Sequence, residues 1–151
     1  MNEYVRKYNL TLSDLCDRLT IDQIKEVLLP VSTRDTYRDS LGALSSEIEM
    51  ILNEREVVAS GRTLRLISFL AQLNLHSWRS KDQLDQNPDN YYETVRYGAD
   101  LNGVRNGVLN LLQEEFGEAS PSHRKASFFS PDGDRDFRPR MLGELERGAS
   151  S

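Results

Sequence analysis

Apolar residues recur at helical spacing over four stretches of the chain, and no stretch shows the alternation typical of a strand. Leu12, Leu15 and Leu19 share one face of the first stretch, so we expect a helix over residues 12–29. The second stretch, over residues 33–53, has the most regular apolar stripe. That stripe consists of Tyr37, Leu41, Leu44, Ile48, Ile51 and Leu52.

Two further helices are predicted over residues 61–83 and 89–116. Ser60 is suited to cap the start of the third helix, and Gly117 is suited to end the fourth. The breaker residues at 86–90 separate the two helices with a turn. Because all the connections are short, neighbouring helices should run antiparallel. The sequence therefore predicts an all-α fold, an antiparallel four-helix bundle.

The first helix has an alternative interpretation. Thr11 and Asp14 form a capping pattern at its start, and Thr20 and Gln23 repeat that pattern further along. A kink or a new start at Ile21 would make the bundle irregular.

The composition changes at Glu118, after which Ser, Pro, Arg, Asp and Gly dominate. We expect a helical domain over residues 1–117 and a flexible tail over 118–151. The pair Phe128 and Phe129 could still pack onto the helical domain or onto a second subunit.

The face of the last two helices that should be apolar turns polar part-way along. In the third helix, apolar residues lead by helical steps into Asn74, Trp78 and Asp82. In the fourth helix the same stripe carries Asn102, Asn106 and Gln113, with Arg105 beside them. If the two helices form a hairpin, Asn74 and Asn102 lie within about one turn of each other, so their side chains can meet.

Buried polar groups cost roughly 1–3 kcal/mol each unless they are paired. The polar cluster is therefore either a paired structural network or a ligand site, and the residues leave both open. In the first case Asn residues would set helix register, and Arg105 would pair with Asp100, Asp17 or Asp22.

A net charge of -5 argues against a nucleic-acid-coating protein or a polybasic membrane binder. Cys16 is the only cysteine, which excludes an internal disulfide and fits a reducing compartment, and its apolar neighbours favour a buried thiol. The sequence shows neither the apolar run of a signal peptide nor a membrane span. We expect a cytoplasmic protein, and a homo-oligomer.

No catalytic signature emerges. Two histidines and one cysteine give no metal set, and no phosphate-binding loop or nucleophile elbow occurs. The sequence predicts no cofactor, and an enzyme with Asp82 or Asp17 as general base is the weakest interpretation.

Three segments form a recognisable pattern. They are Asp14-Leu-Cys-Asp-Arg-Leu-Thr-Ile-Asp-Gln-Ile-Lys25, Leu73-Asn-Leu-His-Ser-Trp78 with Lys81-Asp82, and Asp100-Leu-Asn-Gly-Val-Arg-Asn106. Over about residues 12–116, the chain resembles a poorly characterised family of small helical proteins encoded in phage genomes and beside bacterial glycosyltransferase genes. The resemblance implies that one motif comprises Asp17, Lys25, Asn74, Trp78, Asp82, Asn102, Arg105 and Asn106. The family pattern has two adjacent acids where this chain has Lys81 and Asp82, so acid–base chemistry that needed both is missing here.

The leading hypothesis is a binding module, phage-encoded if the resemblance holds, that captures a nucleotide or sugar nucleotide in a polar cleft. Arg105 and Lys25 would bind the anionic group, and Trp78 would stack on a ring. The three asparagines of the motif would bind polar edges, and its two aspartates would orient the cations. The alternative is a structural or protein-interaction protein that acts through a bundle face and the C-terminal tail. A phage protein of either kind would work in the host cytoplasm.

Overall fold

The computed structural model describes residues 10–86 and 88–118, and all regular structure in that part of the chain is helical. The helices are α1 (Leu12–Leu28), α2 (Val31–Glu54), α3 (Gly61–Gln86) and α4 (Tyr91–Glu115), with a 3₁₀ turn, η1 (Pro88–Asn90), before α4. The prediction of an all-α bundle of four helices is confirmed. The tail predicted for 118–151 lies, beyond Glu118, outside the described residues.

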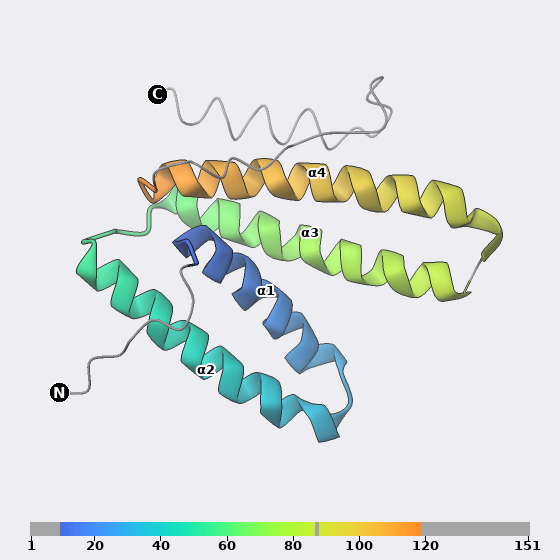
Figure 1. Cartoon of the computed structure of the whole chain (residues 1–151), viewed down its shortest axis with the longest axis horizontal. Coiled ribbons are helices and arrows are strands. Elements are labelled where there is room, and N and C mark those ends of the chain that lie inside the picture. Colours follow the sequence, from blue (N-terminus) through green and yellow to red (C-terminus); the bar gives the residue numbers. More distant parts are fainter. Residues whose placement is uncertain (1–9, 87, 119–151) are drawn as a thin grey trace.

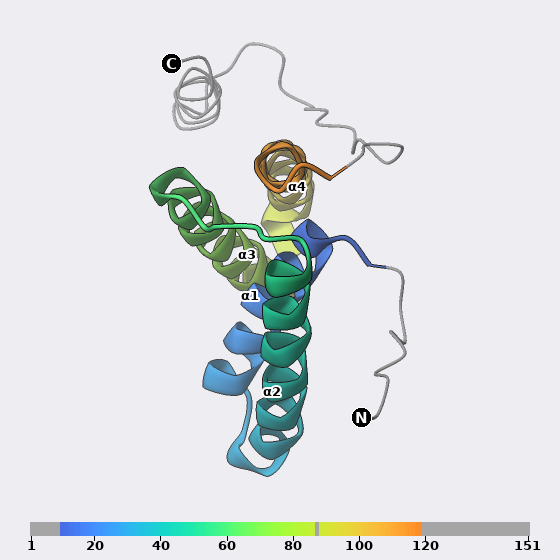
Figure 2. The ribbon, with the colours of Figure 1, turned by 90° about the vertical axis from the view of Figure 1, so that its left-hand side faces the viewer.

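The four helices form two antiparallel hairpins, α1–α2 and α3–α4 (Figure 1). α1 packs against α3 and α4, whereas α2 packs almost entirely against α1. The hairpins approach each other at the end where α1 begins and α4 ends, and they diverge from there (Figures 1 and 2). The bundle is therefore closed at one end and open at the other.

The apolar core lies at the closed end, where all four helices contribute to it. Leu12 of α1, Ile51 of α2, Leu66 of α3 and Val108 of α4 are all buried there. Each such side chain stabilises the fold by roughly 1.5–3 kcal/mol relative to exposure. Among the described side chains between Leu73 and Leu101, by contrast, none that is apolar is buried. The far half of the α3–α4 hairpin extends beyond the core.

Side-chain caps mark the starts of α1 and α3. At the start of α1, Thr11 and Asp14 form the expected capping box. Ser60 and Thr63 exchange the same kind of bonds at the start of α3, with Thr63 N donating to Ser60 Oγ at 3.1 Å. The alternative of a new start at Ile21 is wrong, because α1 is continuous to Leu28.

Hydrogen bonds connect the residues that follow α4 to the start of α1. Gly117 adopts a φ of 63°, and the N–H of Glu118 donates to Gln113 O at 2.9 Å, as expected for a glycine C-cap. This turn directs the Glu118 carboxylate at α1, where it accepts from Leu12 N at 2.8 Å and Ser13 N at 3.1 Å. A carboxylate at a helix N-terminus also interacts favourably with the helix dipole.

Candidate functional site

Asp17 is the centre of a hydrogen-bond network that joins three helices. Its Oδ1 atom accepts from Asn74 Nδ2 of α3 at 2.9 Å and from Arg105 Nε of α4 at 3.1 Å. Its Oδ2 atom accepts from Arg105 Nη2, so the guanidinium binds the carboxylate at two points. Asn74 also donates to Thr20 Oγ1 at 2.8 Å. We call Asp17, Thr20, Asn74 and Arg105 the Asp17 network.

The network lies at the edge of the core, because Cys16, Leu73 and Val104, which belong to the core, directly precede Asp17, Asn74 and Arg105 in the sequence. Asp17 is 9% exposed and Asn74 is 6% exposed. Both amide hydrogens of Asn74 have acceptors, and the carboxylate has three donors. This part of the predicted cluster is therefore a paired network that holds α1 against α3 and α4.

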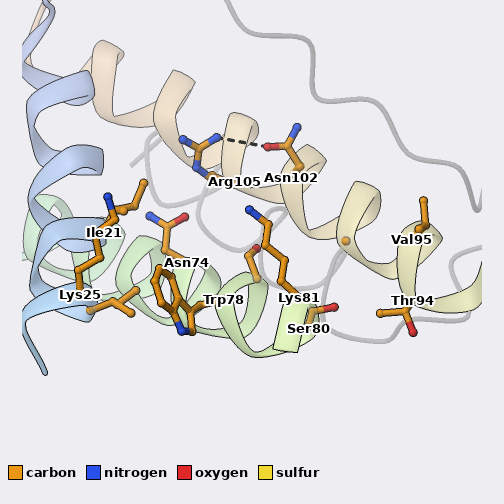
Figure 3. Close-up of a pocket in the computed structure, with 13 residues that line it drawn as sticks. Ile21, Lys25, Asn74, Trp78, Ser80, Lys81, Thr94, Val95, Asn102 and Arg105 are labelled. Atoms are coloured by element: carbon orange, nitrogen blue, oxygen red, sulfur yellow. Dashed lines mark hydrogen bonds between the residues drawn. The ribbon is translucent and has the colours of Figure 1, made fainter. Parts of the chain in front are cut away.

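Asn102 joins the edge of this network from the exposed side of α4. Its Oδ1 atom accepts from Arg105 Nη1 at 3.2 Å, as the dashed line in Figure 3 shows. Asn74 and Asn102 are thus linked through Arg105 and Asp17. The two asparagines, which were predicted to lie close enough to meet, are therefore connected indirectly, through two other side chains.

A cavity of about 660 Å³ opens beside the network, where α1 separates from the α3–α4 hairpin (Figure 3). Five predicted site residues line it, namely Lys25, Asn74, Trp78, Asn102 and Arg105. We call it the α1/α3/α4 pocket. Its apolar lining comes from Ile21, Ile24, Trp78 and Val95.

The other three predicted residues lie elsewhere. Asp17 lines a neighbouring cavity of about 530 Å³ between α1 and α2, which shares Lys25 with the α1/α3/α4 pocket. Asp82 is exposed and Asn106 is half-buried, and neither lines the α1/α3/α4 pocket. Of the two aspartates expected to orient the cations, Asp17 pairs with Arg105. Lys25 lies next to Asp22, which is 5% exposed, and not to Asp82.

Lys81 is a lining residue that the sequence-based prediction left out. In Figure 3 its amino group extends from α3 toward α4, in the direction of Asn102 and Arg105. Asn74, Trp78 and Lys81 are spaced by four and three positions, so they share one helix face. That spacing was the signal that could have revealed it.

The three positive charges around the pocket differ in whether a nearby carboxylate neutralises them. Arg105 is paired with Asp17, and Lys25 lies 3.7 Å from Asp22 and over the Tyr37 ring. Lys81 has no ion pair or hydrogen bond with any side chain that the structure describes. None of the described lining residues carries a carboxylate. The pocket is therefore cationic, although the chain as a whole has a net charge of -5.

Cys16 is buried, as expected, and burial raises the pKa of its thiol to about 12, with smaller contributions from Glu118 and Asp17. Within the described residues no group of three or more His, Cys, Asp or Glu side chains could hold a metal ion. None of the helices described here has the length and apolar character needed to cross a membrane.

Comparisons with protein-family models, with curated proteins and with solved structures give no match for this chain. The resemblance to phage-encoded helical proteins stays a prediction.

Proposed function

We propose that the α1/α3/α4 pocket binds a small organic anion, a nucleotide or a sugar nucleotide, and that the protein is a binding module. The observation that carries this proposal is the charge of the lining, with Lys25, Lys81 and Arg105 present and no carboxylate among the described lining residues. In an acidic chain, three cations around one cavity favour an anionic ligand.

Each part of such a ligand has a matching group in the pocket. Lys81 supplies the charge that no described side chain compensates, so it is the principal contact for a phosphate. Trp78 is half-buried and offers a ring face for stacking. Arg105 lends further positive charge while Asp17 and Asn102 hold its guanidinium in place.

The size of the pocket agrees with this class of ligand. Small-molecule sites are typically ~300–1,000 Å³ in volume, and this cavity is about 660 Å³. The resemblance to proteins encoded beside glycosyltransferase genes makes sugar nucleotides the first compounds to test.

The test is a titration of the full chain with UDP and UDP-glucose, followed by tryptophan fluorescence and by calorimetry. Trp78 is the only tryptophan, so a change in emission reports on the pocket. Lys81→Ala should weaken binding by about tenfold, which corresponds to ~1.4 kcal/mol for one lost charge-assisted contact.

The matched control is Arg79→Ala, which removes an exposed positive charge from α3 without altering the pocket lining. Binding to Arg79→Ala should match that of the unmodified chain. Equal weakening by both variants would mean that only the overall charge matters, and no binding at millimolar ligand would refute the proposal.

A second candidate function, protein interaction, has one specific observation in its favour. Tyr91, Tyr92 and Val95 at the start of α4 are 63%, 71% and 43% exposed. Large exposed apolar side chains gathered on one helical turn are typical of a contact surface. In this case the partner is a second copy of the chain. Tyr91→Ser with Tyr92→Ser would then lower the mass measured by sedimentation, whereas His76→Ser, at another exposed position, would not.

A further inference from the structure

We infer that residues 128–137 of this chain dock in the α1/α3/α4 pocket and act there as an internal competitor of the anionic ligand. The docking itself depends on the observed lining, and only the competition rests on the proposed function. The chemistry of the pocket, the composition of the segment and the length of chain between Glu118 and Phe128 support this docking.

The pocket combines two kinds of surface. Ile21, Ile24, Trp78 and Val95 make one part of its lining apolar, and Val95 is 43% exposed. Beside them, Lys81 lacks a counter-charge within the described residues. An occupant that covers the whole pocket must therefore present apolar and anionic groups close together.

One segment of the chain has this composition. Residues 128–137 read Phe-Phe-Ser-Pro-Asp-Gly-Asp-Arg-Asp-Phe, with three Phe, three Asp and one Arg, so their net charge is -2 (3 Asp minus 1 Arg). The flanking stretches are basic, with Arg124 and Lys125 before the segment and Arg138 and Arg140 after it. Within residues 124–140, the acidic residues thus lie only between Phe128 and Phe137.

The segment can reach the pocket. Glu118 is bonded to the backbone N–H groups of Leu12 and Ser13 at the start of α1. Ile21 and Lys25 lie further along the same helix, at about 14–20 Å from its start at ~1.5 Å per residue. The ten residues from Glu118 to Phe128 span up to about 33 Å when extended.

Attachment makes even weak docking effective. A short linker raises the local concentration of a tethered segment to about the millimolar range. A segment with a dissociation constant near 1 mM for the pocket would therefore occupy it about half of the time. A ligand would have to displace the segment, which lowers its apparent affinity by the corresponding fraction.

The experiment uses the full chain without any ligand and measures acrylamide quenching of Trp78, the only tryptophan. In one variant Phe128 and Phe129 become Ala, and in a second Asp132, Asp134 and Asp136 become Asn. We expect the quenching constant to rise about twofold in each, because the indole becomes more accessible. The control, Met141→Ala with Leu142→Ala, removes the same kind of side chains outside the segment and should leave quenching unchanged.

A synthetic peptide of residues 126–138, added to the Phe128→Ala, Phe129→Ala chain, should restore the protection of Trp78 from quenching. Addition of 0.5 M NaCl should weaken this protection, because salt screens the attraction between the segment and the pocket. Unchanged quenching in both segment variants would overturn the inference. Protection that increases with protein concentration would also overturn it, because the segment would then dock on a second copy. Failure of UDP or UDP-glucose to bind would refute the proposed function and leave this result intact.

Discussion

Asp17 of α1 and Arg105 of α4 form a two-point ion pair across 88 positions of sequence. Their side chains are 12% and 24% exposed, so the pair is largely shielded from solvent. It is one of the polar connections between the two hairpins, and it lies beside the α1/α3/α4 pocket, which Arg105 lines.

Removing the guanidinium should therefore destabilise the fold. Arg105→Ala leaves the Asp17 carboxylate buried with Asn74 as its one remaining side-chain donor in the network, and we expect a loss of about 3 kcal/mol in the free energy of unfolding. Urea denaturation measures this loss. Arg79→Ala, at an exposed position of α3, should change it by less than ~0.5 kcal/mol. In an Asp17→Asn background the Arg105→Ala effect should shrink, and full additivity would contradict the pairing.

Glu118 should stabilise the start of α1. Glu118→Gln removes the negative charge beside the Leu12 and Ser13 N–H groups, so we expect a loss of about 1 kcal/mol in the free energy of unfolding. Glu114→Gln is the control, because Glu114 is exposed. Equal effects of the two substitutions would show that the carboxylate does not cap the helix.

The Cys16 thiol should make stability fall at alkaline pH. Its pKa is about 12 in the folded chain against an ordinary value of 9.0, so the unfolded chain loses the proton first as the pH rises. This contribution is fully present below pH 9 and is lost between pH 9 and 12, with a slope of ~1.4 kcal/mol per pH unit. Comparing the unfolding free energy of the unmodified chain and of Cys16→Ala across this range isolates the effect. Equal slopes would contradict it.

Gln113 is a buried amide that an apolar side chain can replace. It is 1% exposed, and its Nε2 and Oε1 atoms have no hydrogen-bond partner among the described residues. Gln113→Met keeps the length of the side chain and removes both polar atoms. We therefore expect the free energy of unfolding to rise by about 1 kcal/mol, as measured by thermal or urea denaturation. Gln72→Met at an exposed position should have no effect. A loss of stability in Gln113→Met would mean that the amide has a partner in the folded protein.

Glu56, two residues after the end of α2, has a backbone conformation that suits glycine. Its φ is 53°, and the following N–H of Val57 donates to Leu52 O at 2.9 Å, the pattern of a glycine C-cap. Glu56→Gly should raise the free energy of unfolding by about 0.5–1 kcal/mol, since glycine adopts this conformation without a Cβ penalty. Glu56→Ala keeps the Cβ and should not stabilise. A gain with alanine would place the cause in charge rather than backbone conformation.

The sequence alone determined the local features of this protein. The helical stripes, the capping residues Thr11 and Ser60, and the C-terminal glycine Gly117 each act within a few residues, so their patterns predicted the four helices nearly to their ends. The burial of Cys16 followed in the same way from its position on an apolar face.

The tertiary structure decided how these pieces meet. The sequence offered Arg105 three carboxylates, and only the rotation of α1 against α4 selects Asp17. The divergence of the two hairpins, which no local pattern encodes, opens the pocket, brings Lys81 to its lining and leaves Asp82 exposed. Helix spacing places residues on a common face, but which face is covered and which is left open depends on the packing angle between hairpins.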